Sequence, residues 1–242
     1  MFWHFQHDTG DTYMDSRIYT MTHKTFEFPA GVDETLYLPL HVGRSLGEDL
    51  GYWGDDTGES ISEKNGSFCE LTGMYWVWKN VTCDVVGVAH YRRYFIYGEQ
   101  NRVLRREELE EFLRDCDFLI SASYPSGEGS IYENYDHWHN IGDLAVCRQV
   151  LTELYPQDVD AFDLQIGSTL FCGGNLFATS KRIYDEYCNW LFSILFEVEK
   201  RVDVSGYDRY QKRLFGFLAE RLLRVFVLSH QYRVKELRVG QA

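Results

Sequence analysis

Short apolar runs and longer amphipathic segments alternate along most of the chain. Runs of four to seven largely apolar residues predict buried strands at 17–22, 36–42, 85–89, 117–121, 169–172 and 175–178. Apolar residues spaced three or four apart predict helices at 67–79, 105–116, 136–154, 181–201 and 208–227. This alternation predicts an α/β fold, a Rossmann-like domain with a mostly parallel central sheet and a helical C-terminal part.

The length of the chain favours one domain, because 242 residues can bury one substantial core. Residues 1–16 show no period, so we expect a loose leader there and a single domain over 17–242. No apolar run reaches the roughly 18 residues of a membrane span, and no signal peptide is recognisable. We therefore expect a cytoplasmic protein, and peripheral contact with the inner membrane stays open.

Charge and composition narrow the choice of partner. The chain carries 24 basic and 37 acidic side chains, a net charge of −13. Nucleic acid requires a basic face, so we expect no nucleic-acid partner. The 17 tyrosines and 6 tryptophans include side chains of the kind that stack on sugar rings and bases. The six cysteines contain no C-x-x-C pair, which indicates reduced thiols rather than disulfides or a zinc site.

The stretch D-V-V-G-V-A-H-Y-R-R-Y-F at 84–95 joins a buried strand to two adjacent arginines. Ligands of open α/β sheets bind outside the carboxyl ends of the strands, and arginine matches phosphate or carboxylate with a planar fork of donors. We therefore predict an anion site, most simply for a diphosphate, at Arg92 and Arg93. The alternative is that both arginines pair with acidic side chains. Strand alternation would point only one of them into a cleft, so at least one is expected to be structural.

Two further groups have both a functional and a structural interpretation. His139 and Asp143 lie four apart in a predicted helix, where they could bind a metal, act as base and orienter, or form an ordinary surface hydrogen bond. Asp55, Asp56 and Glu59 lie in a long loop at 47–66, where they could form a metal cluster or a solvated loop.

Standard nucleotide fingerprints are missing from the sequence: neither G-x-x-x-x-G-K-[ST] nor a G-x-G-x-x-G after a strand occurs. Six other motifs occur together: I-S-x-K-N at 61–65, C-E-L-T-x-x-Y-W-x-W-K-N at 69–80, H-Y-R-R-Y-F at 90–95, H-x-x-x-D-L at 139–144, G-N-L-F at 174–177 and R-x-x-G-F-L-x-E-R-L at 213–222. Over roughly 17–235 they resemble a bacterial family of capsular and exopolysaccharide biosynthesis proteins, once catalogued only as a domain of unknown function. That family commonly has Asn-Met-Phe where this chain has Asn175-Leu176-Phe177.

The resemblance implies a glycosyltransferase of the GT-A type. Its donor would be a nucleotide-diphosphate sugar, a UDP-sugar with UDP-galactofuranose as one option. Its acceptor would be a glycan or lipid-linked saccharide in capsule, exopolysaccharide or O-antigen synthesis. Many such enzymes hold a divalent cation with D-x-D at the end of a central strand, where this chain has His90-Tyr91-Arg92-Arg93. We therefore predict no metal ligands and no cofactor, although Mn²⁺ or Mg²⁺ stays open.

The resemblance and the residue types together suggest three groups of site residues. For the donor diphosphate we expect His23, Lys24, His90, Tyr91, Arg92 and Arg93. For the acceptor or sugar we expect Glu70, Tyr75, Trp76, His137, Asn175 and Arg213. For the catalytic base we expect Glu220, or Asp143 with His139. Glu70 also fits a helix-capping box with Ser67, and Glu220 could simply pair with Arg224 one turn along a helix.

Two other classes of protein compete with this prediction. A non-catalytic carbohydrate-binding protein would explain the aromatic residues but not the arginine pair after a buried strand. A phosphotransferase or phosphatase would use the arginines, but it would also need a metal cluster or a nucleophile loop, and the sequence shows neither.

Overall fold

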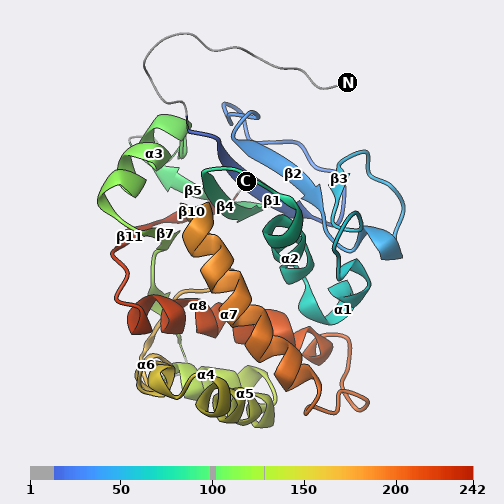
Figure 1. The fold of residues 1–242 in the computed structure, drawn as a ribbon, viewed down its shortest axis with the longest axis vertical. Coiled ribbons are helices and arrows are strands. Elements are labelled where there is room, and N and C mark those ends of the chain that lie inside the picture. The colour runs from blue at the N-terminus through green and yellow to red at the C-terminus, as the bar shows by residue number, and fades with distance from the viewer. Residues whose placement is uncertain (1–13, 99–101, 128, 242) are drawn as a thin grey trace.

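A mixed sheet with the order β11-β7-β10-β4-β1-β2-β3 forms the centre of the computed structural model, which describes residues 14–98, 102–127 and 129–241 (Figure 1). Its strands are β1 (Ser16–Thr22), β2 (Tyr37–His41), β3 (Trp53–Gly54), β4 (Val85–His90), β7 (Phe118–Ser121), β10 (Phe177–Ser180) and β11 (Val234–Leu237). Along this path only β10 runs antiparallel to its neighbours. The predicted α/β fold with a mostly parallel sheet is confirmed. Most of the expected leader at 1–16 lies outside the described residues.

The remaining elements surround this sheet. Short strands β5 (Arg93–Tyr97), β6 (Arg102–Val103) and β12 (Val239–Gln241) extend it, and β8 (Tyr124–Pro125) and β9 (Leu170–Phe171) form a separate two-stranded antiparallel sheet. The helices are α1 (Asn65–Phe68), α2 (Leu71–Asn80), α3 (Arg106–Asp115), α4 (Ile131–Trp138), α5 (Ile141–Leu154), α6 (Val159–Ile166), α7 (Lys181–Glu199) and α8 (Leu214–Ser229). Among the described residues, no helix combines the length and the apolar character needed to cross a membrane.

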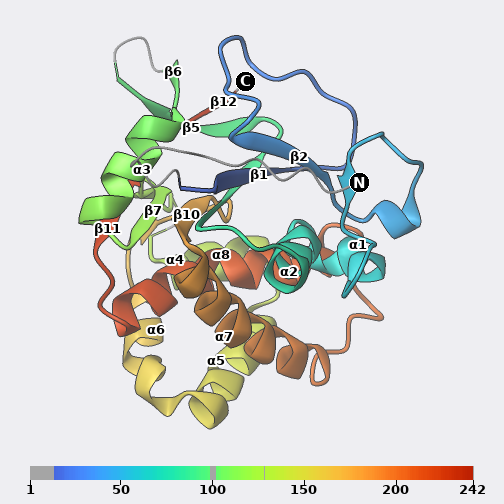
Figure 2. The same ribbon diagram turned by 45° about the horizontal axis from the view of Figure 1, so that its top comes forward.

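Strand alternation divides the interior into two cores. Tyr19 on β1 and Val86 on β4 face the larger core, which holds α2, α7 and α8. Ile18 and Val85, their neighbours in sequence, face a smaller core that holds Leu109 of α3. Figure 1 shows α4, α5 and α6 grouped at the end of the molecule away from β2 and β3, and α5 and α6 keep that place in Figure 2. The carboxyl ends of β1 and β4 lie beside α1 and the start of α8, and a cleft opens there.

Two predicted helices are interrupted in the structure. The helix expected at 67–79 breaks at Cys69, whose φ of 53° ends α1 before α2 begins. The capping box expected for Ser67 and Glu70 is wrong, because Ser67 lies inside α1 and the Glu70 side chain makes no cap hydrogen bond. The helix expected at 136–154 is also divided, because His139 has an extended backbone between α4 and α5 and Asn140 caps α5.

Candidate active site

A cleft of about 600 Å³ opens at the carboxyl ends of β1 and β4. The two strands are parallel neighbours, and Met21 is paired in register with His90. The turn before β10 reaches the same edge, because β10 runs antiparallel to β4. The lining residues are Met21, Thr22, His23, Val42, Asn65, Gly66, Cys69, Glu70, His90, Tyr91, Arg92, Arg93, Gly174, Arg209, Arg213 and Glu220.

Four arginines give this cleft a positive charge in a protein of net charge −13: Arg92, Arg93, Arg209 and Arg213. Within the described part of the chain, none of the four guanidinium groups lies within 4.0 Å of a carboxylate. Most other arginines of the described chain do have an acidic partner, such as Arg148 with Asp163 at 2.5 Å. Four cations around one hollow, none of them in a direct ion pair with a described carboxylate, provide a site for an anionic ligand.

Tyr91 organises one wall of the cleft. The Arg92 guanidinium lies 4.9 Å and the Lys24 ammonium 5.1 Å from the centre of its ring. The imidazole of His23 meets the same ring edge-on, with 5.5 Å between the centroids. Burial lowers the pKa of His23, and the neighbouring Lys24 and Arg92 lower it further. A neutral imidazole at this position leaves the positive charge to the lysine and the arginines.

Both arginines of the H-Y-R-R-Y-F motif line the cleft, so the expectation that only one of them faces it is wrong. Strand β4 ends at His90, residues 91–92 form a tight turn, and Arg93 begins β5 opposite His90. Side-chain alternation does not continue through such a turn. The motif therefore presents two guanidinium groups to one hollow.

A second turn, Gly174–Asn175, links three sides of the cleft. The Gly174 N–H donates to Glu220 Oε1 at 2.8 Å, and the Gly174 carbonyl oxygen lies 2.5 Å from Nε2 of His90. A carbonyl can only accept, so His90 carries its proton on Nε2 in this contact. The Asn175 amide donates to Oε1 of Glu70 at 2.7 Å. Both residues have positive φ, 91° for Gly174 and 49° for Asn175, which glycine and asparagine tolerate best.

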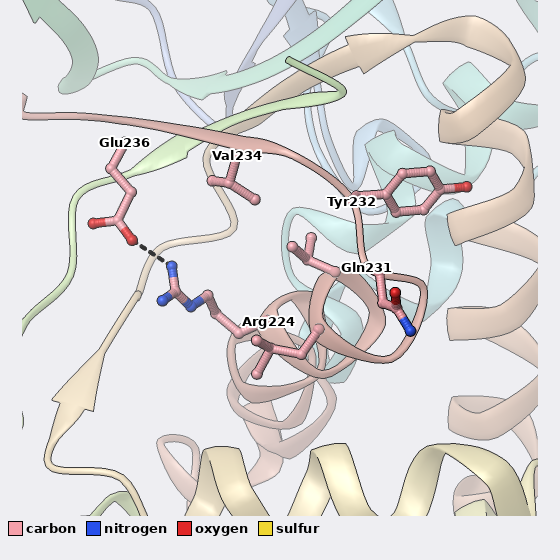
Figure 3. Close-up of a pocket in the computed structure, with 7 residues that line it drawn as sticks. Arg224, Gln231, Tyr232, Val234 and Glu236 are labelled. Carbon is pink, nitrogen blue, oxygen red and sulfur yellow. Dashed lines mark hydrogen bonds and ion pairs between the residues drawn. The ribbon is translucent and has the colours of Figure 1, made fainter.

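Glu220 is held between this turn and a buried arginine. Oε2 of Glu220 accepts from Arg221 at 3.1 Å, and only 3 % of the Arg221 side chain is exposed. Burial raises the pKa of Glu220, and the nearby Glu70 raises it further, while Arg221 opposes both effects. The alternative pairing with Arg224 is wrong. Figure 3 shows Arg224 reaching instead to Glu236 across a smaller hollow between α8 and β11, at 2.5 Å.

Cys69 and Arg213 close the cleft between α1 and α8. The Arg213 Nε donates to the Cys69 sulfur at 3.3 Å. Burial, followed by the charge of Glu70, raises the pKa of Cys69 to about 11, so the thiol stays neutral near pH 7. The contact positions Arg213 without neutralising it, and its charge remains available to a ligand.

The structure does not bring His139 and Asp143 together at the cleft. The Asp143 carboxylate accepts from the Tyr207 hydroxyl at 2.7 Å, and the His139 ring stacks on Phe217 with 4.0 Å between centroids. Burial, with the charges of Arg221 and Arg213, lowers the pKa of His139 to about 4. Neither residue lines the cleft. The break between α4 and α5 removes the helical spacing on which their predicted pairing depended.

Three residues expected to bind the acceptor also lie away from this cleft. The Tyr75 hydroxyl donates to Glu59 at 2.7 Å and the Trp76 indole donates to the Thr57 carbonyl at 2.9 Å, so both face the acidic loop. His137 is exposed near the end of α4. Arg213 and Glu70 line the cleft, while Asn175 is 1 % exposed and reaches it through Glu70.

The carboxylates of the loop at 47–66 make separate structural contacts and do not converge on one point. Asp55 accepts from the Gly43 N–H at 2.8 Å and from the Ser62 hydroxyl, and Asp56 lies 3.5 Å from Arg44. Among the described residues, no three His, Cys, Asp or Glu side chains are grouped so that they could hold a metal ion. Asp55, Asp56 and Glu59 therefore do not form the metal cluster that was one of the two interpretations of this loop.

Arg209 and Asn65 line the cleft but were not expected there. A signal for Arg209 exists in the sequence, because R-Y-Q-K-R at 209–213 is a basic cluster in an acidic chain. The role of Asn65 is harder to predict from the sequence, because its side-chain amide binds a backbone group. It donates to the Cys69 carbonyl at 2.7 Å. That contact helps to hold the break between α1 and α2.

Comparison with known proteins gives two similarities. The family model described as a domain of unknown function, DUF4422, matches residues 17–231. The solved apo structure of WbbM, described as a bifunctional glycosyltransferase, is similar with a TM-score of 0.84 and 29 % sequence identity, over 94 % of this chain and 45 % of that chain. The present chain thus spans less than half of that protein's chain. No curated protein matches the sequence.

Proposed function

The chain belongs to the family described as a domain of unknown function, DUF4422, and we propose that it is a glycosyltransferase that moves a sugar from a UDP-sugar to a saccharide acceptor. The similarity to a solved bifunctional glycosyltransferase supports the transferase class. We further propose that residues 17–242 form one catalytic domain, which the extent of the family match supports.

The observation that carries this proposal is a set of four arginines around one cleft, none with a carboxylate of the described residues within 4.0 Å: Arg92, Arg93, Arg209 and Arg213. When a glycosidic bond to a nucleoside diphosphate breaks, negative charge develops on the leaving diphosphate. Fixed guanidinium groups stabilise that charge without reorganising at the moment of reaction. Lys24 adds a further positive charge at the same strand ends, while the Nε2–H of His90 is used by the Gly174 carbonyl.

The cleft also offers a group that can take a proton. Transfer to a hydroxyl requires a base beside the attacking oxygen, and a carboxylate commonly serves. Glu70 and Glu220 are the carboxylates that line the cleft. Asp143, the other expected candidate, bonds to Tyr207 and does not line the cleft.

The substrates can be proposed more narrowly. The H-Y-R-R-Y-F motif and its companions support membership of a family that builds capsules, exopolysaccharides or O-antigens, with UDP-galactofuranose as one donor. The acceptor would then be a growing glycan or a lipid-linked saccharide. The alternative, a non-catalytic carbohydrate-binding protein, gives no role to the four arginines.

Calorimetry with a panel of UDP-hexoses, UDP and the free hexoses tests the donor proposal. We expect UDP and at least one UDP-sugar to bind, and the free sugar to bind far more weakly, because the arginines recognise the diphosphate. An Arg213→Ala variant should lose affinity, whereas Arg182→Ala should not, because Arg182 is exposed on α7 and pairs with Glu186. Equal affinity for a sugar and its UDP derivative would contradict the proposal. Release of UDP in the presence of donor separates an enzyme from a binding protein.

A further inference from the structure

The two carboxylates of the cleft are held in different ways. Both oxygens of Glu220 have protein donors, the Gly174 N–H at 2.8 Å and Arg221 at 3.1 Å. Glu70 accepts one hydrogen bond, from Asn175 to Oε1 at 2.7 Å. Within the described residues its Oε2 has no hydrogen-bond partner. Glu70 thus keeps one carboxylate oxygen available to a hydroxyl in the cleft.

We propose that Glu70 is the catalytic base of the transfer and that Asn175 is the residue that positions it. This inference rests on the proposed glycosyltransferase function. The acceptor hydroxyl gives its proton to Oε2 of Glu70 while its oxygen forms a bond to the anomeric carbon of the donor. The bond from that carbon to the β-phosphate oxygen breaks, and its electron pair leaves with UDP, which the cleft arginines hold.

The local backbone explains why Glu70 can serve in this way. The chain turns sharply at Cys69, with φ of 53° and ψ of −131°, so Glu70 precedes α2 without capping it. The side chain is therefore free to cross to the turn before β10. Glu220 does not form a hydrogen bond with Oε2 of Glu70, because both Glu220 oxygens accept from other groups, the Gly174 N–H and Arg221.

Asn175 is suited to a positioning role. It is 1 % exposed, and its left-handed backbone, φ 49°, follows a glycine with φ of 91°. The preceding Gly174 is hydrogen-bonded to both His90 and Glu220. These two contacts hold the backbone of the turn that carries Asn175. The Asn175 amide thus holds Oε1 of Glu70, a side chain that lines the cleft, and does not occupy Oε2.

Glu220 has a different role in this scheme. Arg221 is 2 % exposed and needs a counter-charge, which Glu220 supplies. Through the Gly174 N–H, Glu220 also anchors the turn that carries Asn175. Replacing Glu220 by glutamine keeps an oxygen for the Gly174 N–H, so turnover should fall much less than when Glu70 is replaced.

The first test uses release of UDP from the UDP-hexose that the wild type turns over best, with water as acceptor. Glu70→Gln should lower kcat by about 10²–10⁴, the usual contribution of a general base. Its affinity for UDP, measured by calorimetry, should stay within about threefold of wild type. Glu63→Gln, an exposed glutamate outside the cleft, is the matched control. If Glu70→Gln keeps more than about a tenth of the wild-type kcat, the assignment is wrong.

The second test addresses Asn175 with two variants that tolerate its backbone. Asn175→Gly removes the amide but allows positive φ, and should lower kcat with little change in KM for the donor. Asn175→Asp places a second carboxylate against Glu70, which disfavours the ionised base and should move the acidic limb of the kcat profile upward by about one pH unit or more. An acidic limb that stays at its wild-type position would overturn the assignment of Glu70 as the base, and an unchanged kcat in Asn175→Gly would overturn the positioning role of Asn175.

These outcomes are distinguishable from failure of the proposed function. A wild-type protein that releases no UDP from any donor would overturn the glycosyltransferase proposal together with this inference. A wild type that is active, with Glu220→Gln inactive and Glu70→Gln active, would keep the glycosyltransferase and reassign the base to Glu220.

Discussion

Replacing Arg221 by methionine should destabilise the fold through a charge left alone in the interior. Arg221 lies above the ring of Phe171 at 4.5 Å and donates to Glu220, to the Phe217 carbonyl and to Asn134. Methionine is apolar and flexible enough to fill much of the same space. The variant removes the cation but leaves the Glu220 carboxylate, so burial of that carboxylate is no longer compensated.

The size of the effect follows from the burial of the pair. Breaking a buried ion pair by removing one partner costs about 3–5 kcal/mol. Side-chain exposure is 3 % for Arg221 but 22 % for Glu220, so the lower end of this range, about 3 kcal/mol, applies. In a domain of this size each kcal/mol lowers Tm by about 2–4 °C, so Tm should fall by about 6–12 °C.

The pH dependence has a defined sign. The pKa of Glu220 in the folded protein is raised above its ordinary value of 4.5, mainly by burial. Between the unfolded and folded pKa values the folded state therefore binds more protons, and this group makes stability fall as pH rises. Removing Arg221 takes away the attraction that lowers the pKa of Glu220. The destabilisation should be smaller at pH 4.5 than at pH 8.

Denaturant unfolding of four proteins measures this: wild type, Arg221→Met, Glu220→Gln and the double variant. We expect a coupling energy of about 1–3 kcal/mol, because the double variant leaves neither charge alone. Arg224→Met is the matched control on the same helix. Its ion pair with Glu236 lies nearer the surface, with side-chain exposures of 22 % and 36 %, so its loss should cost about 0–1 kcal/mol. Additive single-variant effects for Arg221 and Glu220, within about 0.5 kcal/mol, would show that the two charges do not depend on each other.

Four further predictions concern other parts of the molecule. Arg93→Lys should lower kcat/KM for the UDP-sugar by about 10²–10³, because lysine keeps the charge but loses the bidentate contact; an unchanged value would remove Arg93 from the donor site. Gly174→Ala should cost about 1–2 kcal/mol in denaturant unfolding and reduce UDP release, since its φ is 91° and a Cβ would lie 2.9 Å from Leu176 and 3.3 Å from Arg93. The pKa of His139 is about 4 in the folded protein against an ordinary 6.5, so between these pH values the folded state binds fewer protons than the unfolded state. The free energy of unfolding should therefore fall by up to about 3 kcal/mol as pH drops from 6.5 to 4. His139→Gln should flatten that slope in unfolding curves collected across this pH range, and an unchanged slope would assign it to other groups. UDP release should survive EDTA because arginines carry the positive charge of the donor site; loss of turnover that Mn²⁺ restores would contradict this.

Strand signals are local, so the apolar runs were sufficient to identify β1, β2, β4, β7 and β10 of the central sheet, but not the two-residue strand β3, and the run at 169–172 forms β9 outside that sheet. The apolar run before His90 and the arginines after it identified both β4 and the edge where the cleft opens. The direction of the two arginines was not predictable, because it depends on the turn at 91–92 and on β5 pairing back onto β4. A rule based on strand alternation fails where the strand ends.

The helix breaks at Cys69 and His139 were missed for a related reason. Both lie within continuous amphipathic patterns, and no proline or glycine marks either break. The break at Cys69 is held by tertiary contacts, including the bond from Arg213, which is far away in sequence. The contact between Asn175 and Glu70 spans 105 residues, so no local pattern could reveal it.

A crystal structure of the protein with UDP would show directly whether the arginine-lined cleft is the donor site. We expect density for UDP in the cleft at the ends of β1 and β4. Its diphosphate oxygens should lie within hydrogen-bond distance, about 2.7–3.2 Å, of at least two of the guanidinium groups of Arg92, Arg93, Arg209 and Arg213. UDP bound elsewhere, such as in the hollow between α8 and β11, or in the cleft without an arginine on its diphosphate, would contradict the proposed donor site.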